Sequence, residues 1–161
     1  MTNFEIEIDE EVDGEIVGVV VTWPDAEAVA VDYWGYYVAN DRFNADRPIR
    51  LRGTTKEDAA HTLVDKLCAD ADPKALGLVV ALASSAPDRE SLFYLGAGPV
   101  EDLVRTHGDA LVGDVLAAAA QHPRFKIALS GVWLEVPPKL QAQTLAKLMP
   151  WLGDDDTTPF I

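Results

Sequence analysis

The sequence predicts a mostly α-helical fold, a compact antiparallel array of about seven or eight short helices with an N-terminal β-hairpin. Residues 4–23 show strand-like patterning, whereas later segments repeat apolar side chains at helical spacing. The connections between these helical segments are short, which favours antiparallel neighbours. We expect a single domain over 1–161, made of the hairpin at 1–23, the helical array at 24–150 and an acidic tail at 151–161.

The hairpin is predicted from the stretch FEIEID at 4–9, which alternates apolar and acidic residues strictly. Asp13-Gly14 favours a tight turn, and a β-branched stretch follows it. Two strands alone are marginal in water, so the hairpin must pack on the rest of the fold or on another chain. Its free edges are sites for strand addition, and we take Ile6 and Ile8 as candidate partner-binding residues.

A helix beginning near Pro24 is predicted to carry an aromatic stripe. Apolar residues recur on it at helical spacing, namely Ala30, Tyr33, Trp34, Tyr37 and Val38. Large aromatic side chains one turn apart usually bury their area in the core. We therefore interpret the stripe as core, and keep as an alternative that it stacks on a flat ligand.

The loop at 40–53 concentrates basic side chains. Its Asp, Asn, Pro and Gly residues break regular structure. It carries Arg42, Arg47, Arg50 and Arg52, four of the 13 basic residues of the chain. Guanidinium groups bind carboxylates and phosphates. These arginines are candidate partner-binding residues, against the simpler interpretation that they pair with acids of the same chain.

Residues 54–95 are predicted to form three further elements. Thr54 and Glu57 fit a capping box at the start of a helix that ends near Asp70. The segment 74–85 is apolar nearly all round, so it fits a central buried helix or a buried strand. A short helix is expected from about residue 88 to residue 95.

The glycine cluster GAGP at 96–99 is predicted to turn the backbone rather than to bind a phosphate. A phosphate loop needs free N–H groups at a helix start and no negative charge nearby. Pro99 has no N–H, and Glu101 and Asp102 place carboxylates in the first turn of the next helix. We expect this helix to end at Gly108 in a left-handed conformation, with another helix after it.

Two more amphipathic helices are expected in the C-terminal part. The first stripe comprises Phe125, Ala128, Leu129, Val132 and Trp133, and the second comprises Leu140, Leu145, Leu148 and Met149. Pro137-Pro138 separates the two. The tail GDDDTTPFI is expected to be solvated up to its final Phe160-Ile161.

Three stretches resemble one known family: LGAGPVEDLV at 95–104, HGDALV at 107–112 and HPRFKIALSGVW at 122–133. They are similar to the C-terminal block of a bacterial family of small helical proteins of unknown function. In that block Leu stands where this chain has Val100. The resemblance covers roughly 73–133 and implies a mostly helical fold without an established activity. The hairpin and the helix after Pro138 lie outside it.

The net charge of −14 limits the choice of partners. Nucleic acid and anionic membrane surfaces would repel such a chain, so we expect neither. The longest apolar stretch, 75–83, is too short to span a membrane, and the acidic N-terminus is unlike a signal peptide. We therefore expect a cytoplasmic protein. Its acidity either attracts a basic protein partner or simply maintains solubility.

We predict no catalytic residue, no cofactor and no metal site. The sequence contains no G-x-S-x-G, S-x-x-K or H-E-x-x-H pattern. His61 has Glu57 and Asp65 four residues to either side but no second histidine one turn away, so a surface histidine is favoured over a metal ligand. Cys68, the single cysteine, lies on an apolar helical face and is expected to be a buried, inert thiol.

The leading functional hypothesis is a non-enzymatic protein-interaction module, and its concrete form is an immunity- or antitoxin-like protein that binds a basic toxin. Small size, high acidity and the exposed hairpin motivate it. One alternative is a small-ligand-binding protein or enzyme that uses Tyr33, Trp34 and Tyr37 with the arginine loop as a pocket. A second alternative is a structural subunit that self-associates into a homo-oligomer through the hairpin.

Overall fold

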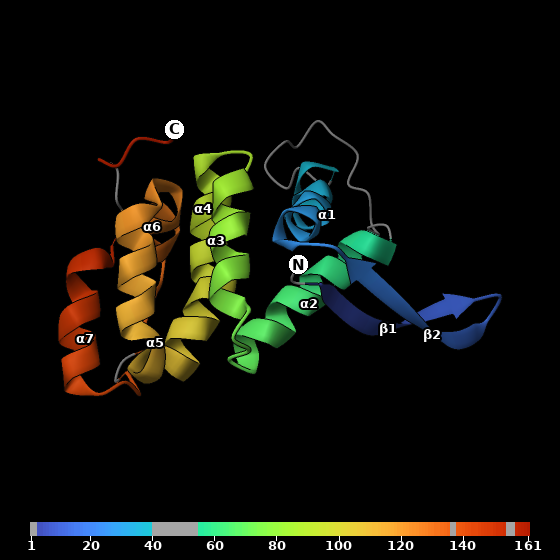
Figure 1. The fold of residues 1–161 in the computed structure, drawn as a ribbon, viewed down its shortest axis with the longest axis horizontal. Coiled ribbons are helices and arrows are strands. Elements are labelled where there is room, and N and C mark those ends of the chain that lie inside the picture. Colours follow the sequence, from blue (N-terminus) through green and yellow to red (C-terminus); the bar gives the residue numbers. More distant parts are fainter. Residues whose placement is uncertain (1–2, 40–54, 136–137, 154–156) are drawn as a thin grey trace.

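A computed structural model describes residues 3–39, 55–135, 138–153 and 157–161 (Figure 1). The strands are β1 (Phe4–Val12) and β2 (Glu15–Trp23). The helices are α1 (Ala26–Ala39), α2 (Thr55–Ala69), α3 (Ala75–Ser85), α4 (Arg89–Leu95), α5 (Glu101–Gln121), α6 (Pro123–Ser130) and α7 (Ala142–Leu148), with a π-helical segment η1 (Gly96–Val100) and a 3₁₀ turn η2 (Met149–Trp151). The predicted mostly helical fold with an N-terminal hairpin is confirmed.

The hairpin has the tight turn that its sequence predicts. β1 and β2 pair antiparallel and in register over their full length. Asp13 and Gly14 form the turn with φ values of 54° and 85°. This left-handed region is what a two-residue turn between twisted strands requires, and Asp-Gly adopts it readily. The base of the hairpin adjoins α1 and α2, while its tip projects away from the helices (Figure 1).

The core lies between the central helices. In Figure 1, α7, α6 and the neighbouring α3 and α4 follow one another from left to right, with α1, α2 and the hairpin further right. α3 packs against α1 and α6, and α4 packs against α6. Most of the largest fully buried side chains come from α3 to α6, namely Leu78, Leu82, Leu92, Leu95, Leu103, Phe125, Ile127 and Leu129.

Helix α3 decides the alternative that the sequence leaves open at 74–85. The segment is a helix, and Leu78, Val79 and Leu82 have no exposed surface. The next helix, α4, lies within the expected range of about 88–95, and its start is capped by the Asp88 carboxylate, which accepts a hydrogen bond of 2.7 Å from the backbone N–H of Ser91. The expected central buried element is therefore confirmed as a helix.

The glycine cluster bends a helix instead of separating two helices. α4, η1 and α5 follow one another without a gap, and the backbone is kinked at Gly98, with φ −127° and ψ −105°. Pro99 has no N–H for the helical hydrogen-bond pattern, which accounts for the kink. Counted as one kinked helix, these segments reduce the described helices to six, slightly fewer than the seven or eight expected.

The predicted helix end at Gly108 is wrong. Gly108 lies inside α5, and the glycines with positive φ among the described residues are Gly14 and Gly153. A Cβ on Gly108 would lie 3.2 Å from Cδ2 of Leu140. The small residue therefore makes room for the segment that leads into α7. The glycine is needed for this contact between distant segments. In the sequence alone, the same glycine resembles a C-terminal helix cap.

Gly96 and Gly131 allow α4 and α6 to approach very closely. A Cβ on Gly96 would lie 2.1 Å from the carbonyl oxygen of Ala128, and one on Gly131 would lie 3.2 Å from Cα of Phe93. Any side chain at Gly96 would collide with backbone rather than with a movable side chain. The glycines on both sides of this contact thus bring the two helices together.

The C-terminal part departs from expectation at two places. Trp133 is 74% exposed and does not belong to the core stripe, because α6 ends at Ser130. Thr158, expected to be solvated, is buried, and its carbonyl accepts a hydrogen bond of 2.8 Å from Nη1 of Arg89. The guanidinium of Arg124 lies 4.2 Å from the ring centroid of Phe160. Thr158 and Phe160 of the tail therefore contact the helices, whereas Ile161 remains exposed.

Candidate functional site

The hairpin consists of a packed base and an exposed tip. The base is anchored by Phe4, Ile6, Val21 and Trp23, all buried in the core. The rest of the hairpin, residues 7–20, we call the tip, and it carries four exposed apolar side chains, Val12 (48% exposed), Ile16 (69%), Val17 (43%) and Val20 (57%). Apolar side chains gathered on a projecting element are typical of a surface that contacts another protein.

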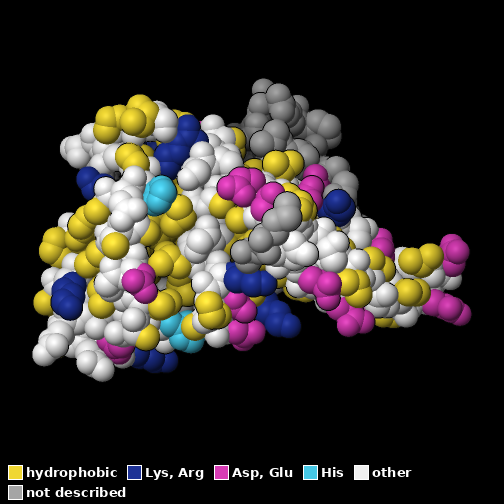
Figure 2. Space-filling view, in the orientation of Figure 1, with side chains coloured by type: hydrophobic (Ala, Val, Ile, Leu, Met, Phe, Trp, Pro, Cys, Tyr) yellow, Lys and Arg dark blue, Asp and Glu magenta, His cyan; other side chains and the backbone are white. Residues whose placement is uncertain are grey.

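One face of the hairpin, which we call the acidic face, combines carboxylates with apolar side chains. Successive side chains of a strand point to opposite faces. The acidic face therefore carries Glu5, Glu7, Asp9 and Glu11 of β1, opposite Thr22, Val20, Gly18 and Ile16 of β2. In Figure 2 acidic and hydrophobic side chains lie next to each other over the projecting hairpin. A partner at this face would meet both kinds of side chain.

The charge of the hairpin has one sign. It contains Glu5, Glu7, Asp9, Glu10, Glu11, Asp13 and Glu15, and residues 1–41 contain no Lys or Arg. Because the hairpin itself has no Lys or Arg, these carboxylates favour a negative potential at its exposed tip. A basic molecule would be attracted there, and an acidic one would be repelled.

A groove between β1 and α2 extends this acidic surface. Its volume is about 580 Å³, and Glu5, Glu7 and Asp9 line it from β1. Asp72 lines it from the segment after α2, and among the described lining residues Lys66 is the one basic side chain. With four carboxylates and one ammonium group, the groove suits a basic side chain of a partner.

The structure places Ile6 in the core and leaves Ile8 half-buried. The exposed apolar side chains near them belong to Val12 and to β2, and the sequence interpretation missed these. The sequence did contain a signal for these exposed residues. Residues 16–21 have no polar side chain at any position, whereas a strand with only one face on the core needs apolar side chains at every second position. The other candidates, Arg42, Arg47, Arg50 and Arg52, lie outside the described residues.

The aromatic stripe of α1 belongs to the core, as expected. Tyr33 and Trp34 are buried, and Nε1 of Trp34 donates a hydrogen bond of 2.9 Å to the carbonyl of Leu82. The Tyr33 ring stacks on His61 with a centroid separation of 4.0 Å. Burial raises the pKa of Tyr33 well above its ordinary value. These rings pack on protein groups, which leaves little of their surface for a ligand.

Cys68 is a buried, free thiol, as predicted. Burial raises its pKa to about 12, and the negative charges of Asp65 and Asp102 add to the effect. The thiolate is the nucleophilic form of cysteine, so this environment suppresses reactivity. His61 is engaged as well, because its Nε2 donates to the carbonyl of Tyr33 at 3.2 Å.

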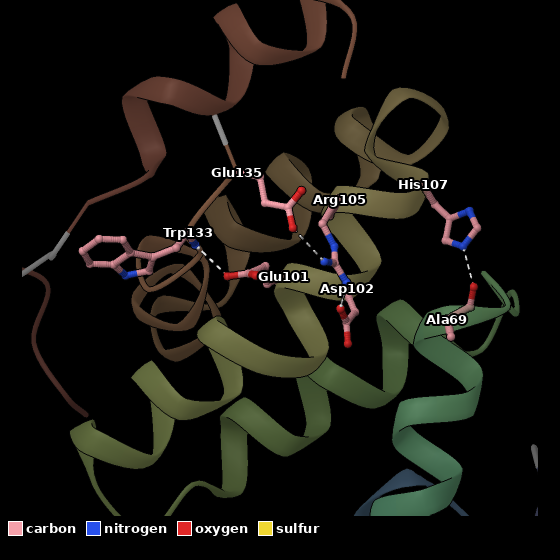
Figure 3. A network of polar contacts seen from close by, with 7 residues as sticks. All are labelled: Ala69, Glu101, Asp102, Arg105, His107, Trp133 and Glu135. Carbon is pink, nitrogen blue, oxygen red and sulfur yellow. Dashed lines mark hydrogen bonds and ion pairs between the residues drawn. The ribbon is translucent and has the colours of Figure 1, made fainter. Parts of the chain in front are cut away.

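The start of α5 is tied to two other segments by polar contacts (Figure 3). The Glu101 carboxylate accepts a hydrogen bond of 3.0 Å from the backbone N–H of Trp133. Arg105 pairs with Asp102 and lies 3.6 Å from a carboxylate oxygen of Glu135. In addition, Nε2 of His107 donates to the carbonyl of residue 69, the last residue of α2, at 2.9 Å. These groups bond one another and hold the fold together.

A second cavity, of about 540 Å³, lies beside α7. Its walls are mostly aliphatic and include Leu134, Leu145 and Leu152, and its charged lining residue is Glu135. That carboxylate already faces Arg105. Ligand pockets usually combine apolar walls with a few polar groups that converge on the ligand. The described lining residues of this cavity do not include such a set.

Comparison with known proteins places the chain in one family. Residues 53–144 match a family described as a family of unknown function (DUF6869). The chain belongs to this family. No curated protein and no solved structure matches the chain. The matched region covers α2 to α6, so the hairpin lies outside the part that defines the family.

Two negative findings concern the described residues of this DUF6869 protein. No group of three or more His, Cys, Asp or Glu side chains in the described part of the chain is placed to hold a metal ion. None of the helices that the structure describes is both long enough and apolar enough to cross a membrane.

Proposed function

We propose that this protein is an interaction module that binds a basic protein partner through its N-terminal hairpin. The observation that carries the proposal is the exposed tip, where apolar side chains lie beside a row of carboxylates. Burial of these apolar side chains would supply affinity, roughly 1–2 kcal/mol for each that becomes fully covered. The carboxylates would accelerate association with a basic partner and disfavour acidic ones.

The concrete form of the proposal is an immunity- or antitoxin-like protein that occludes a basic toxin. The small chain of 161 residues and its net charge of −14 are in keeping with this form. It predicts a neighbouring gene for a basic protein whose toxicity is relieved when both proteins are made together. A neighbour that is harmless, or equally toxic with and without this protein, would refute this form.

The two alternatives have less support. A ligand pocket at Tyr33 and Trp34 would need access to side chains that are buried. Self-association of the hairpin would bring two sets of carboxylates together without a Lys or Arg to balance them. Light scattering of the full chain at neutral pH tests the second alternative directly, and a stable dimer would favour it over a basic partner.

The experiment compares full-length protein with the double variant Ile16→Ser/Val20→Ser. The exposed residue Val31 on α1 provides a matched control, Val31→Ser. Each protein is immobilised at low salt and exposed to host extract, and any recovered protein of high isoelectric point is purified. By titration calorimetry we expect the purified partner to bind the wild-type protein 1:1, with an affinity that falls as salt is added. Val31→Ser should bind equally well, and the double variant should not bind. Equal binding by all three proteins would contradict the proposal.

A further inference from the structure

The outer edge of β2 is open. In the part of the chain that the structure describes, the sheet has two strands, and no other strand pairs with β2. α2 packs beside β1, whereas residues 15–20 of β2 are exposed or half-buried. An unpaired strand edge presents N–H and C=O groups that accept a further strand. The hairpin thus offers a template for an extended segment of a partner.

Gly18 brings a carboxylate across this strand. A Cβ on Gly18 would lie 2.7 Å from Oε1 of Glu7, so the Glu7 carboxylate lies directly over the glycine. Asp9 is the residue paired with Gly18 in the register of the sheet. Because Gly18 has no side chain, negative charge from β1 reaches over β2 toward its open edge.

We infer that the partner adds a strand to β2 and places a Lys or Arg opposite Gly18, an inference that rests on the function proposed above. Neighbouring strands lie about 4.8 Å apart, so a basic side chain opposite Gly18 would reach the Glu7 carboxylate. On the same face the residues two positions to either side would contact Ile16 and Val20. The partner segment therefore has a basic residue, with an apolar residue two positions before it and another two positions after it.

A second copy of this chain does not fit the same position. The hairpin has no Lys or Arg that could lie opposite Gly18 of another copy. Pairing of two β2 edges would instead bring the carboxylates of both hairpins together, and like charges across a sheet are destabilising. The charges thus favour a different, basic chain as the added strand.

The test uses synthetic peptides and the full-length protein. The probe is acetyl-Ser-Val-Thr-Lys-Thr-Val-Ser-amide, whose symmetry lets it pair in either strand direction. One control peptide has Glu in place of Lys. Another carries N-methyl groups on the backbone nitrogens of the Lys and of both Thr residues, because the Lys N–H donates to Gly18 in antiparallel pairing and a Thr N–H donates in parallel pairing. NMR titration gives the affinity, and amide hydrogen exchange reports whether residues 15–20 of β2 become protected.

Two protein variants distinguish the effect of the carboxylate over Gly18 from the effect of net charge. Glu7→Gln removes the carboxylate over Gly18, and Glu11→Gln removes an equal charge from the same face, opposite Ile16. We expect Glu7→Gln to weaken binding of the Lys peptide about fivefold and Glu11→Gln less than twofold. Gly18→Ala should weaken it as well while remaining folded, because its Cβ displaces only the end of the Glu7 side chain.

The inference is supported if the Lys peptide, and neither control peptide, protects the amides of β2 from hydrogen exchange. It also requires that Glu7→Gln weakens binding of the Lys peptide more than Glu11→Gln does. Equal effects of the two variants, equal binding of the N-methylated peptide, or no protection of β2 would overturn it. These outcomes test only the mode of binding. The proposed function is tested separately, by the partner experiment with Ile16→Ser/Val20→Ser. If that experiment succeeds while β2 stays unprotected, the partner binds the hairpin by another mode.

Discussion

The helical body and the tip of the hairpin use apolar residues in opposite ways. In the body, Gly96 brings α4 so close to α6 that the Ala128 carbonyl leaves no space for a methyl group. At the tip, Ile16 and Val20 remain mostly exposed. Packing accounts for the buried apolar residues of the body, but nothing within the described fold covers those of the tip. Exposed apolar residues such as Val31 and Trp133 also occur on the body. That difference teaches that a partner surface is best sought where burial leaves apolar residues unexplained.

The same contrast exists within the hairpin itself. Both strands keep one pairing register from base to tip. Phe4 and Ile6 are nevertheless buried, while Val12, on the same strand, is exposed. The strands simply extend beyond the helices that cover their base (Figure 1). Stability therefore resides at one end of the hairpin, and the proposed function resides at the other.

Thiol reactivity should show the largest difference between the two regions. Cys68 has its pKa raised from 9.0 to about 12, so its thiolate fraction at pH 8 should be about a thousandfold below that of an ordinary thiol. A thiol introduced by Val20→Cys, in a Cys68→Ala background, should react as an exposed cysteine. Iodoacetamide labelling followed by mass spectrometry measures both rates. Similar rates would mean that the body opens as readily as the tip.

Tight helix packing in the body predicts a large loss of stability for Gly96→Ala. The new Cβ would meet the backbone carbonyl of Ala128, which cannot rotate away. We expect a loss of roughly 2–4 kcal/mol in the free energy of unfolding. Gly77→Ala in α3 is the matched control, because a Cβ there meets nothing within 4 Å. Helix propensity should make that variant more stable by about 1 kcal/mol, as measured by urea denaturation.

Equivalent truncations at the two ends of the hairpin should differ in their effects. Ile6→Ala removes a buried side chain and should cost roughly 2–4 kcal/mol. Ile16→Ala removes an exposed one and should change stability by less than about 0.5 kcal/mol. Urea denaturation measures both, and affinity for the purified partner should fall in Ile16→Ala. A large loss of stability in Ile16→Ala would show that the tip is structural.

The smallest effect is expected for Asp65→Asn on α2. Partial desolvation raises the pKa of Asp65, and repulsion by Asp102 adds to it. The folded protein therefore holds this proton more tightly than the unfolded chain does. Its contribution to stability is full below the unfolded pKa of 3.8 and is lost as pH rises through the folded pKa. Asp65→Asn should thus be slightly more stable than wild type at pH 7.

This gain should shrink as the pH is lowered toward 4. Thermal unfolding at several pH values measures it, with Asp114→Asn on the exposed side of α5 as a control for net charge. A gain of the same size in both variants would assign the effect to overall charge rather than to the surroundings of Asp65. The prediction would also be contradicted if Asp65→Asn were less stable than wild type at pH 7.

The sequence by itself determined most of the local structure. Strict alternation predicted β1, Asp13-Gly14 predicted the turn, and a short helix was expected at about 88–95, where α4 lies. Apolar patterning also identified 74–85 as a central buried element and Cys68 as a buried thiol, although it left open whether 74–85 is a helix or a strand. These features depend on periodicity and on hydrogen bonds between near neighbours in the chain, so they are present in any short window of the sequence.

The tertiary structure alone decided what the glycines do and which apolar residues remain exposed. Gly108 had the local features of a helix end, yet its neighbour is Leu140, about thirty residues further along the chain. Likewise, no property of Ile16 distinguishes it from Ile6 until the extent of the covering helices is known. Burial depends on contacts between segments that are distant in sequence, and such contacts leave no periodic signal in either segment.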